Sequence, residues 1–151
     1  MAIPNTLPLN IFGTTVVAEN SVIAPADQTI TTNTQLSVDG STYISFTQAT
    51  SATLNITLPF AVNGSGALDY SGLAGQTRVI FNASTAADTD KLQVRRVLTV
   101  DGSGNPVTYS NILLLQANRT PGITGPAGAT FACDGSSWIV VAASQKTVPS
   151  L

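Results

Sequence analysis

The residues of this 151-residue chain that could take part in catalysis are few. The sequence contains no histidine, which is the commonest general base and the commonest metal ligand in proteins. Asp88 and Asp90 flank Thr89, and two carboxylates at this spacing could bind a calcium ion or act as an acid and base pair. Acidic residues in a polar connection are more often simply solvated. We therefore expect no catalytic site, no metal site and no cofactor.

Two further kinds of side chain could have a chemical role. Cys133 is the single cysteine, so it has no disulfide partner within the chain. Because no histidine is present to activate it, we expect a small buried hydrophobe rather than a reactive thiol. An exposed aromatic ring could stack on a sugar, although packing in a core or at a subunit interface is the commoner fate of such rings. The candidates are Tyr43, Tyr70, Tyr109 and Trp138.

The composition favours a protein that associates closely with others. Hydrophobic residues make up 43% of the chain, but charged residues only 9%, against about 25% in an average soluble protein. A net charge of -2 with so few ions of either sign gives weak self-repulsion. The six Lys and Arg form no basic stripe, so we expect no nucleic-acid partner. No apolar run approaches the roughly 20 residues that span a bilayer, so we expect no membrane partner.

The stretch from Thr130 to Ala143 predicts a hairpin that closes the fold. An apolar run, the Asp134-Gly135 turn signal and a second apolar run follow one another, and Gly135 can adopt the positive φ of a tight reversal. Trp138 carries the largest apolar surface in the chain. We expect its side chain to cover one end of a core.

Other strands are predicted from alternating or apolar runs between turn signals. Asn111 to Arg119 tolerates either strand or helix, with strand favoured. Gly122, Gly125 and Gly128 recur too few times for a collagen helix, so Thr120 to Ala129 is expected to be an extended loop. The predicted elements are strands at Ile11–Val17 and Ser21–Ile23, a hairpin at Gln35–Thr47 around Asp39-Gly40, a strand at Thr53–Leu58 ended by Pro59, a central strand at Thr77–Asn82, and a hairpin of Lys91–Val100 with Val107–Leu115.

Three segments lie outside this pattern. Residues 1–10 contain Pro4 and Pro8 without periodicity, which is typical of an extended arm or a frayed terminus. Asn63 to Gln76 is rich in glycine, and a loop of this length is usually functional, so we take it as a candidate contact surface. Residues 144–151 are expected to form a C-terminal tail.

Together these patterns predict an all-β protein with nine or ten short strands. We expect a single-domain antiparallel β-sandwich or barrel, jelly-roll-like, over residues 11–143, with an extended N-terminal arm. Spacing of this kind does not determine the order of the strands.

Three segments resemble the β-structured fibre and capsid decoration proteins of tailed bacteriophages. In those proteins a strand ending in Leu-Pro, a Gly-rich loop entering an apolar strand, and a terminal Asp-Gly-x-x-Trp hairpin occur in this order. The resemblance covers about Ala52 to Ala143. This chain has no heptad stalk and no extended repeat, which favours a compact cement protein over a fibre. The segments are Ala52–Pro59, Gly72–Asn82 and Phe131–Val141.

The resemblance implies a homotrimer on the outer surface of a virion capsid, made in the host cytoplasm and bound to the major capsid protein. The arm and the Asn63 to Gln76 loop would supply the interface. One alternative is a receptor- or glycan-binding tip domain of a phage fibre or tail protein, and a less expected one is a polysaccharide-cleaving enzyme that uses Asp88 and Asp90. The interface candidates are Ile3, Pro4, Leu7, Pro8, Leu68, Tyr70 and Leu73.

Overall fold

The computed structural model describes residues 26–49, 52–84, 90–116 and 124–147, and the structural statements below concern these ranges. They contain nine β-strands and one short 3-10 helix, which confirms the all-β prediction. The elements are β1 (Ala26–Ile30), β2 (Thr34–Gln35), β3 (Tyr43–Gln48), β4 (Thr53–Thr57), the 3-10 helix η2 (Ser71–Leu73), β5 (Thr77–Asn82), β6 (Lys91–Val100), β7 (Pro106–Gln116), β8 (Thr124–Cys133) and β9 (Trp138–Thr147).

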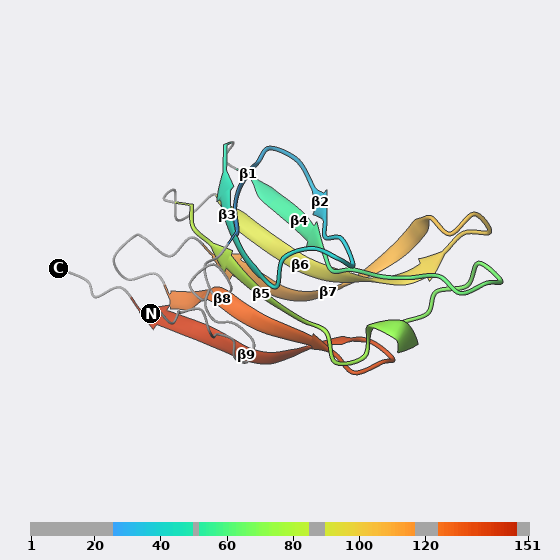
Figure 1. Cartoon of the computed structure of the whole chain (residues 1–151). Helices are drawn as coiled ribbons and strands as arrows, with labels where there is room; N and C mark the ends of the chain where they lie inside the picture. Colours follow the sequence, from blue (N-terminus) through green and yellow to red (C-terminus); the bar gives the residue numbers. More distant parts are fainter. Residues whose placement is uncertain (1–25, 50–51, 85–89, 117–123, 148–151) are drawn as a thin grey trace, which may run out of the picture.

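The strands form two sheets that pack face to face as a sandwich (Figure 1). One sheet has the order β1-β3-β5-β8-β9 and the other the order β2-β4-β6-β7. From β1 to β6 the chain alternates between the two sheets. Strands β1, β3 and β5 belong to the first sheet, and β2, β4 and β6 belong to the second. The hairpins β6-β7 and β8-β9 then complete the sandwich.

This winding makes the sheets mixed rather than antiparallel as expected. Four of the seven strand pairings are parallel and three are antiparallel. The prediction of a hairpin around Asp39-Gly40 is wrong, because β2 and β3 belong to different sheets. Leu36 and Phe46 still point into the same core, from opposite sides. Two successive strands show the same alternation of polar and apolar residues whether they pair as a hairpin or cross from one sheet to the other.

Most of the other predicted elements are confirmed. The strand before Pro59, the central β5, and the β6-β7 and β8-β9 hairpins lie where the sequence pattern places them. Residues 111–116 are strand, not helix. Two boundaries differ, since β8 begins at Thr124 within the expected loop and β9 continues to Thr147 into the expected tail. The strands predicted at 11–17 and 21–23 and the arm at 1–10 lie outside the described residues.

The core lies between the sheets and is closed by Trp138, which is 0% exposed. The indole Nε1 donates a hydrogen bond of 2.7 Å to the carbonyl oxygen of Pro59. This bond joins β9 to the segment that follows β4. The closing role predicted for Trp138 is thus confirmed, and a donor that is costly to bury has a partner.

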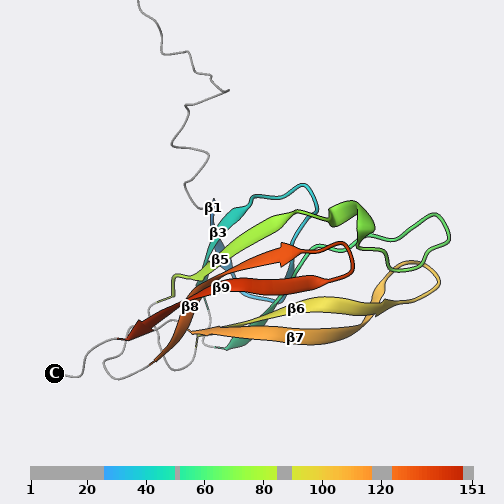
Figure 2. The same cartoon turned by 90° about the horizontal axis from the view of Figure 1, so that it is seen from below.

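Three connections meet at one end of the sandwich, at the right of Figure 1 and again in Figure 2. They are the loop of residues 59–76, the β6-β7 turn at 101–105 and the β8-β9 turn at 134–137. We call this the loop end. Figure 2 also shows β5, β8 and β9 side by side in one sheet.

Candidate functional site

The loop end is built from turns that hold their own shape. Each turn begins with an Asn or Asp whose side-chain oxygen accepts backbone N–H bonds from residues two to four positions later, at 2.8–3.0 Å. Such bonds give the backbone N–H groups of each turn a local acceptor. The residues are Asn63, Asp69, Asp101 and Asp134.

The same bonds lower the pKa of three of these side chains. Hydrogen bonds from the side chain and backbone of Ser71 lower the pKa of Asp69 below its usual 3.8. The backbone N–H of Asn105 lowers the pKa of Asp101, and that of Ser136 lowers the pKa of Asp134. The folded loops therefore favour the charged form of these carboxylates.

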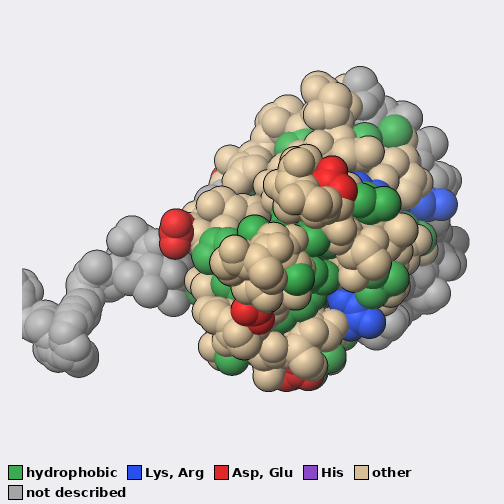
Figure 3. Space-filling model, turned by 90° about the vertical axis from the view of Figure 1, so that its right-hand side faces the viewer, with side chains coloured by type: hydrophobic (Ala, Val, Ile, Leu, Met, Phe, Trp, Pro, Cys, Tyr) green, Lys and Arg blue, Asp and Glu red, His purple; other side chains and the backbone are tan. Residues whose placement is uncertain are grey.

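Neighbouring turns also pack on one another. Gly104 has a φ of 84°, and a Cβ there would lie 3.5 Å from the methyl groups of Val62. The β6-β7 turn therefore lies against the start of the long loop. Figure 3 looks onto this end and shows hydrophobic side chains between the protruding loops, with acidic side chains spaced around them.

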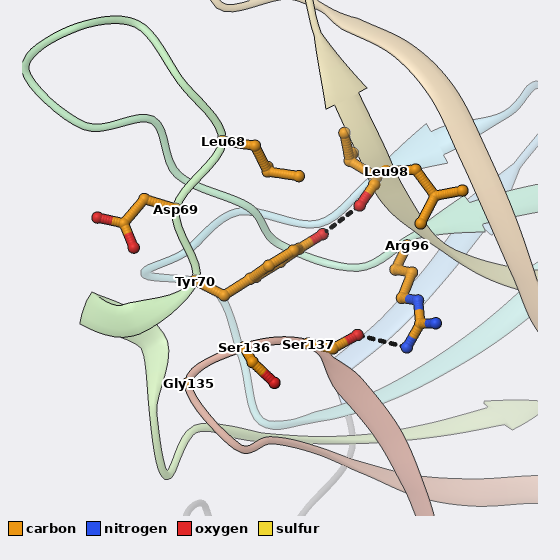
Figure 4. A pocket seen from close by; sticks show the side chains of 9 residues that line it. Leu68, Asp69, Tyr70, Arg96, Leu98, Gly135, Ser136 and Ser137 are labelled. Carbon is orange, nitrogen blue, oxygen red and sulfur yellow. Dashed lines mark hydrogen bonds between the residues drawn. The ribbon is translucent and has the colours of Figure 1, made fainter.

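A cleft of about 340 Å³ opens among these turns (Figure 4). The phenol of Tyr70 crosses from the long loop and donates a 2.7 Å hydrogen bond to the carbonyl oxygen of Val97 in β6. Arg96 Nη1 donates to the carbonyl oxygen of Trp138, at 2.9 Å, and to Ser137 Oγ. The long loop and the β8-β9 turn are therefore both hydrogen-bonded to β6, which makes the cleft preformed.

The walls of the cleft combine apolar and polar groups. Leu68 and Leu98 lie on one side and the hydroxyls of Ser136 and Ser137 on the other, while Asp69 points away from Arg96 (Figure 4). Tyr70 is only 6% exposed, so its ring face is not available to stack on a sugar. Chemically, this arrangement suits hydrogen bonding and apolar contact with a ligand or a protein surface.

The structure places the predicted interface residues in different environments. Leu68 is partly exposed and lines the cleft. Tyr70 and Leu73 are 6% and 3% exposed and belong to the hydrophobic core, so their side chains hold the loop rather than present it. Both are buried because the short helix η2 turns the loop back onto the sandwich. The remaining candidates, Ile3, Pro4, Leu7 and Pro8, lie outside the described residues.

The other candidates for chemistry were Cys133 and the pair Asp88 and Asp90. Cys133 is 2% exposed, and burial raises the pKa of its thiol, which confirms the prediction of a buried hydrophobe. Asp90 is buried, and its backbone carbonyl accepts a bond from Asn82 Nδ2, whereas Asp88 lies outside the described residues. Within the described ranges, no three His, Cys, Asp or Glu side chains are grouped to hold a metal ion.

Sequence reasoning missed a second surface, on the outer side of the five-stranded sheet. Alternating residues of β5, β8 and β9 face outward here and carry no charge. They border a shallow groove of about 220 Å³ that includes Phe81 and Ala142. The sequence signal for this surface was the apolar residues at alternate positions of Thr77–Asn82, which face outward. We call this surface the apolar face and define it by Val79, Phe81, Ala132, Ile139 and Ala142.

Comparison with family models, with curated proteins and with solved structures finds no match for this chain. Among the described residues, no helix has the length and apolar character needed to cross a membrane.

Proposed function

We propose that this chain is a structural protein that acts by association rather than catalysis: a decoration protein that forms a homotrimer and binds the major subunits of a capsid from outside. The proposal joins the resemblance of three sequence segments to phage decoration proteins with the character of the described surface.

The observation that supports it most is the exposure of large hydrophobic side chains. Such residues are unremarkable when scattered, but contiguous groups on a little-charged surface mark interaction sites. Val62 and Leu98 lie at the loop end, and three others lie next to one another on β9. The exposed residues, each 37–58% accessible, are Val62, Phe81, Leu98, Val107, Tyr109, Ile139, Val140 and Val141.

The loop end is the better candidate for the contact with a capsid. Its turns are held by their own Asn and Asp side chains, so little conformational entropy is lost when they bind. Its apolar centre, with Leu68 and Leu98, fits a contact that is mainly apolar and hydrogen-bonded.

The test is to find the chain in particles. Heads and tails of the phage that encodes it would be separated, washed in 1 M NaCl and analysed by quantitative mass spectrometry. We expect the chain in the head fraction, in fixed proportion to the major capsid protein, and retained at high salt because few charges take part. Absence from heads contradicts decoration, and release by salt contradicts an apolar contact.

The cleft favours a second candidate, a glycan-binding tip domain. Its volume and its hydroxyl, carboxylate and guanidinium groups suit a sugar, although Tyr70 offers no ring face. Asp69 is partly exposed at its rim. Binding on a glycan array that Asp69→Ala abolishes, together with recovery in the tail fraction, would replace decoration by this function.

A further inference from the structure

Strand β9 forms an edge of the five-stranded sheet, with β8 as its described neighbour. Edge strands carry a row of unpaired backbone groups, and proteins that stay monomeric commonly protect them with charges, prolines or short length. β9 is ten residues long and has neither charge nor proline before Lys146. This edge therefore lacks the usual protection against pairing.

Three successive side chains of β9 are apolar and exposed, and they lie on both sides of the sheet. Ile139 pairs with Ala132 on the outer side and is 43% exposed. Val140 pairs with the buried Phe131, on the inner side, and is still 37% exposed. Val141 lies where the β8-β9 register shifts and is 58% exposed. Water thus reaches a continuous hydrophobic strip, which we call the β9 edge (Ile139–Val141).

The β9 edge continues into the apolar face. Ala142 of β9 and Phe81 of β5 both line the groove on the outer side, and every residue that borders this groove is uncharged. The Phe81 ring lies over Gly128, where a Cβ would come within 2.5 Å of it. The ring therefore lies flat against the sheet, next to the groove.

We propose that the β9 edge and the apolar face together bind a second copy of this chain. The inference rests on the proposed function, because it identifies the surface through which copies would associate. In a symmetric assembly, like residues approach one another near the symmetry axis, so a charged surface would repel itself whereas a neutral apolar one is complementary to itself.

The size of the surface agrees with a protein partner. Strands β8 and β9 have ten residues each and β5 has six. At sheet spacing, their outer side measures about 400 Å² before side-chain relief. A standard interface buries about 800 Å² per partner. The surface supplies much of such an interface and is far larger than a small ligand needs.

The test compares two exposed valines. Val141→Glu places a charge on the β9 edge, and Val107→Glu places one on β7 of the other sheet, where Val107 is 57% exposed. Sedimentation equilibrium of the full chain measures the mass, and circular dichroism and the emission of the single tryptophan confirm folding. We expect Val141→Glu to weaken self-association by at least about tenfold and Val107→Glu to leave it unchanged.

Folded Val141→Glu protein with wild-type association overturns the inference, and so does equal dissociation of both variants. A wild-type chain that is monomeric at every concentration instead contradicts the proposed association itself. Val141→Thr, which keeps the branched shape preferred in strands, serves if the glutamate variant fails to fold. It should also raise the dissociation constant, and an unchanged constant counts against the proposal.

Discussion

Arg78 brings a positive charge into the core, where it is 3% exposed. Its Nη2 donates to the carbonyl oxygens of Ser37 and Val38, at 3.0 and 2.8 Å, and its Nη1 to that of Thr77, at 2.8 Å. Burial lowers the pKa of this guanidinium, which is the cost of desolvating a charge. In return the crossover between β2 and β3 is fixed to β5.

Replacing Arg78 by Met should therefore destabilise the protein by about 1–3 kcal/mol, because the carbonyls of Ser37 and Val38 lose their donors. Urea unfolding followed by circular dichroism measures the change. Arg95→Met is the matched control, since Arg95 is half-buried and stacks on Tyr109, 3.7 Å from the ring centroid. An equal or larger loss in the control would show that the crossover contacts are not the source of the effect.

Gly128 is the residue on which the Phe81 ring rests. A methyl group at Gly128 collides with that ring, so Gly128→Ala should destabilise the protein by about 1–3 kcal/mol or drive the ring outward. In a Phe81→Ala background the same substitution should cost much less, and a double-mutant cycle in urea measures the difference. A cost that is the same in both backgrounds would contradict the proposed contact.

The three turn carboxylates predict how stability depends on pH. Their folded pKa values lie below the usual 3.8, so they add stability that is complete above that value and is lost as pH falls through the lower, folded values. The free energy of unfolding should therefore decrease as the pH is lowered from about 5. Asp134→Asn should show a smaller decrease than wild type in urea titrations. Identical pH profiles would remove the role given to Asp134.

Residue types alone predicted the buried Cys133 and Trp138, because a lone thiol and a large ring in an apolar run have few other places to go. Arg78 was not predicted. It sits at an inward position of a strand whose neighbours Val79 and Phe81 suggest burial on the opposite side. Only the crossover carbonyls, which come from a distant segment, explain its position.

At the scale of elements, the β8-β9 hairpin joins the sheets and the loop end through Trp138. Its indole bonds Pro59, and its backbone carbonyl accepts from Arg96. Trp138→Phe removes the first of these bonds and some volume, so we expect a loss of roughly 2–4 kcal/mol. Thermal and urea unfolding measure it, with Tyr109→Phe as an exposed control. A loss below about 1 kcal/mol would show that the hairpin does not close the core.

Asp-Gly signals predicted three reversals, and the structure contains all three, but only two join paired strands. A turn signal is local, whereas the choice between a hairpin and a crossover depends on which sheet receives the next strand. The glycines of residues 124–129 led to the wrong prediction of a loop for a similar reason. Gly128 fits a strand because an aromatic ring from β5 covers it, and that contact is not local in sequence.

For the whole molecule, the all-β fold class followed from periodicity, but strand β1 and the parallel winding did not. Parallel partners such as Ile44 and Ile80 are 36 positions apart, with a long loop between them. The loop end was predicted in part through Asn63 to Gln76, whereas the apolar face arises only when β5, β8 and β9 are side by side. The low charge, in contrast, can be read from the composition, and it is the main support for a function in association.

In the proposed function, the protein works by binding copies of itself and neighbouring capsid subunits. Its most direct test is the mass of the full chain by multi-angle light scattering, in 0.15 M and in 1 M NaCl. We predict a multiple of the 15.5 kDa chain mass, with the homotrimer expected, and the same mass at both salt concentrations. A 15.5 kDa monomer at all accessible concentrations would contradict the account, and an oligomer that dissociates in 1 M NaCl would contradict its apolar basis.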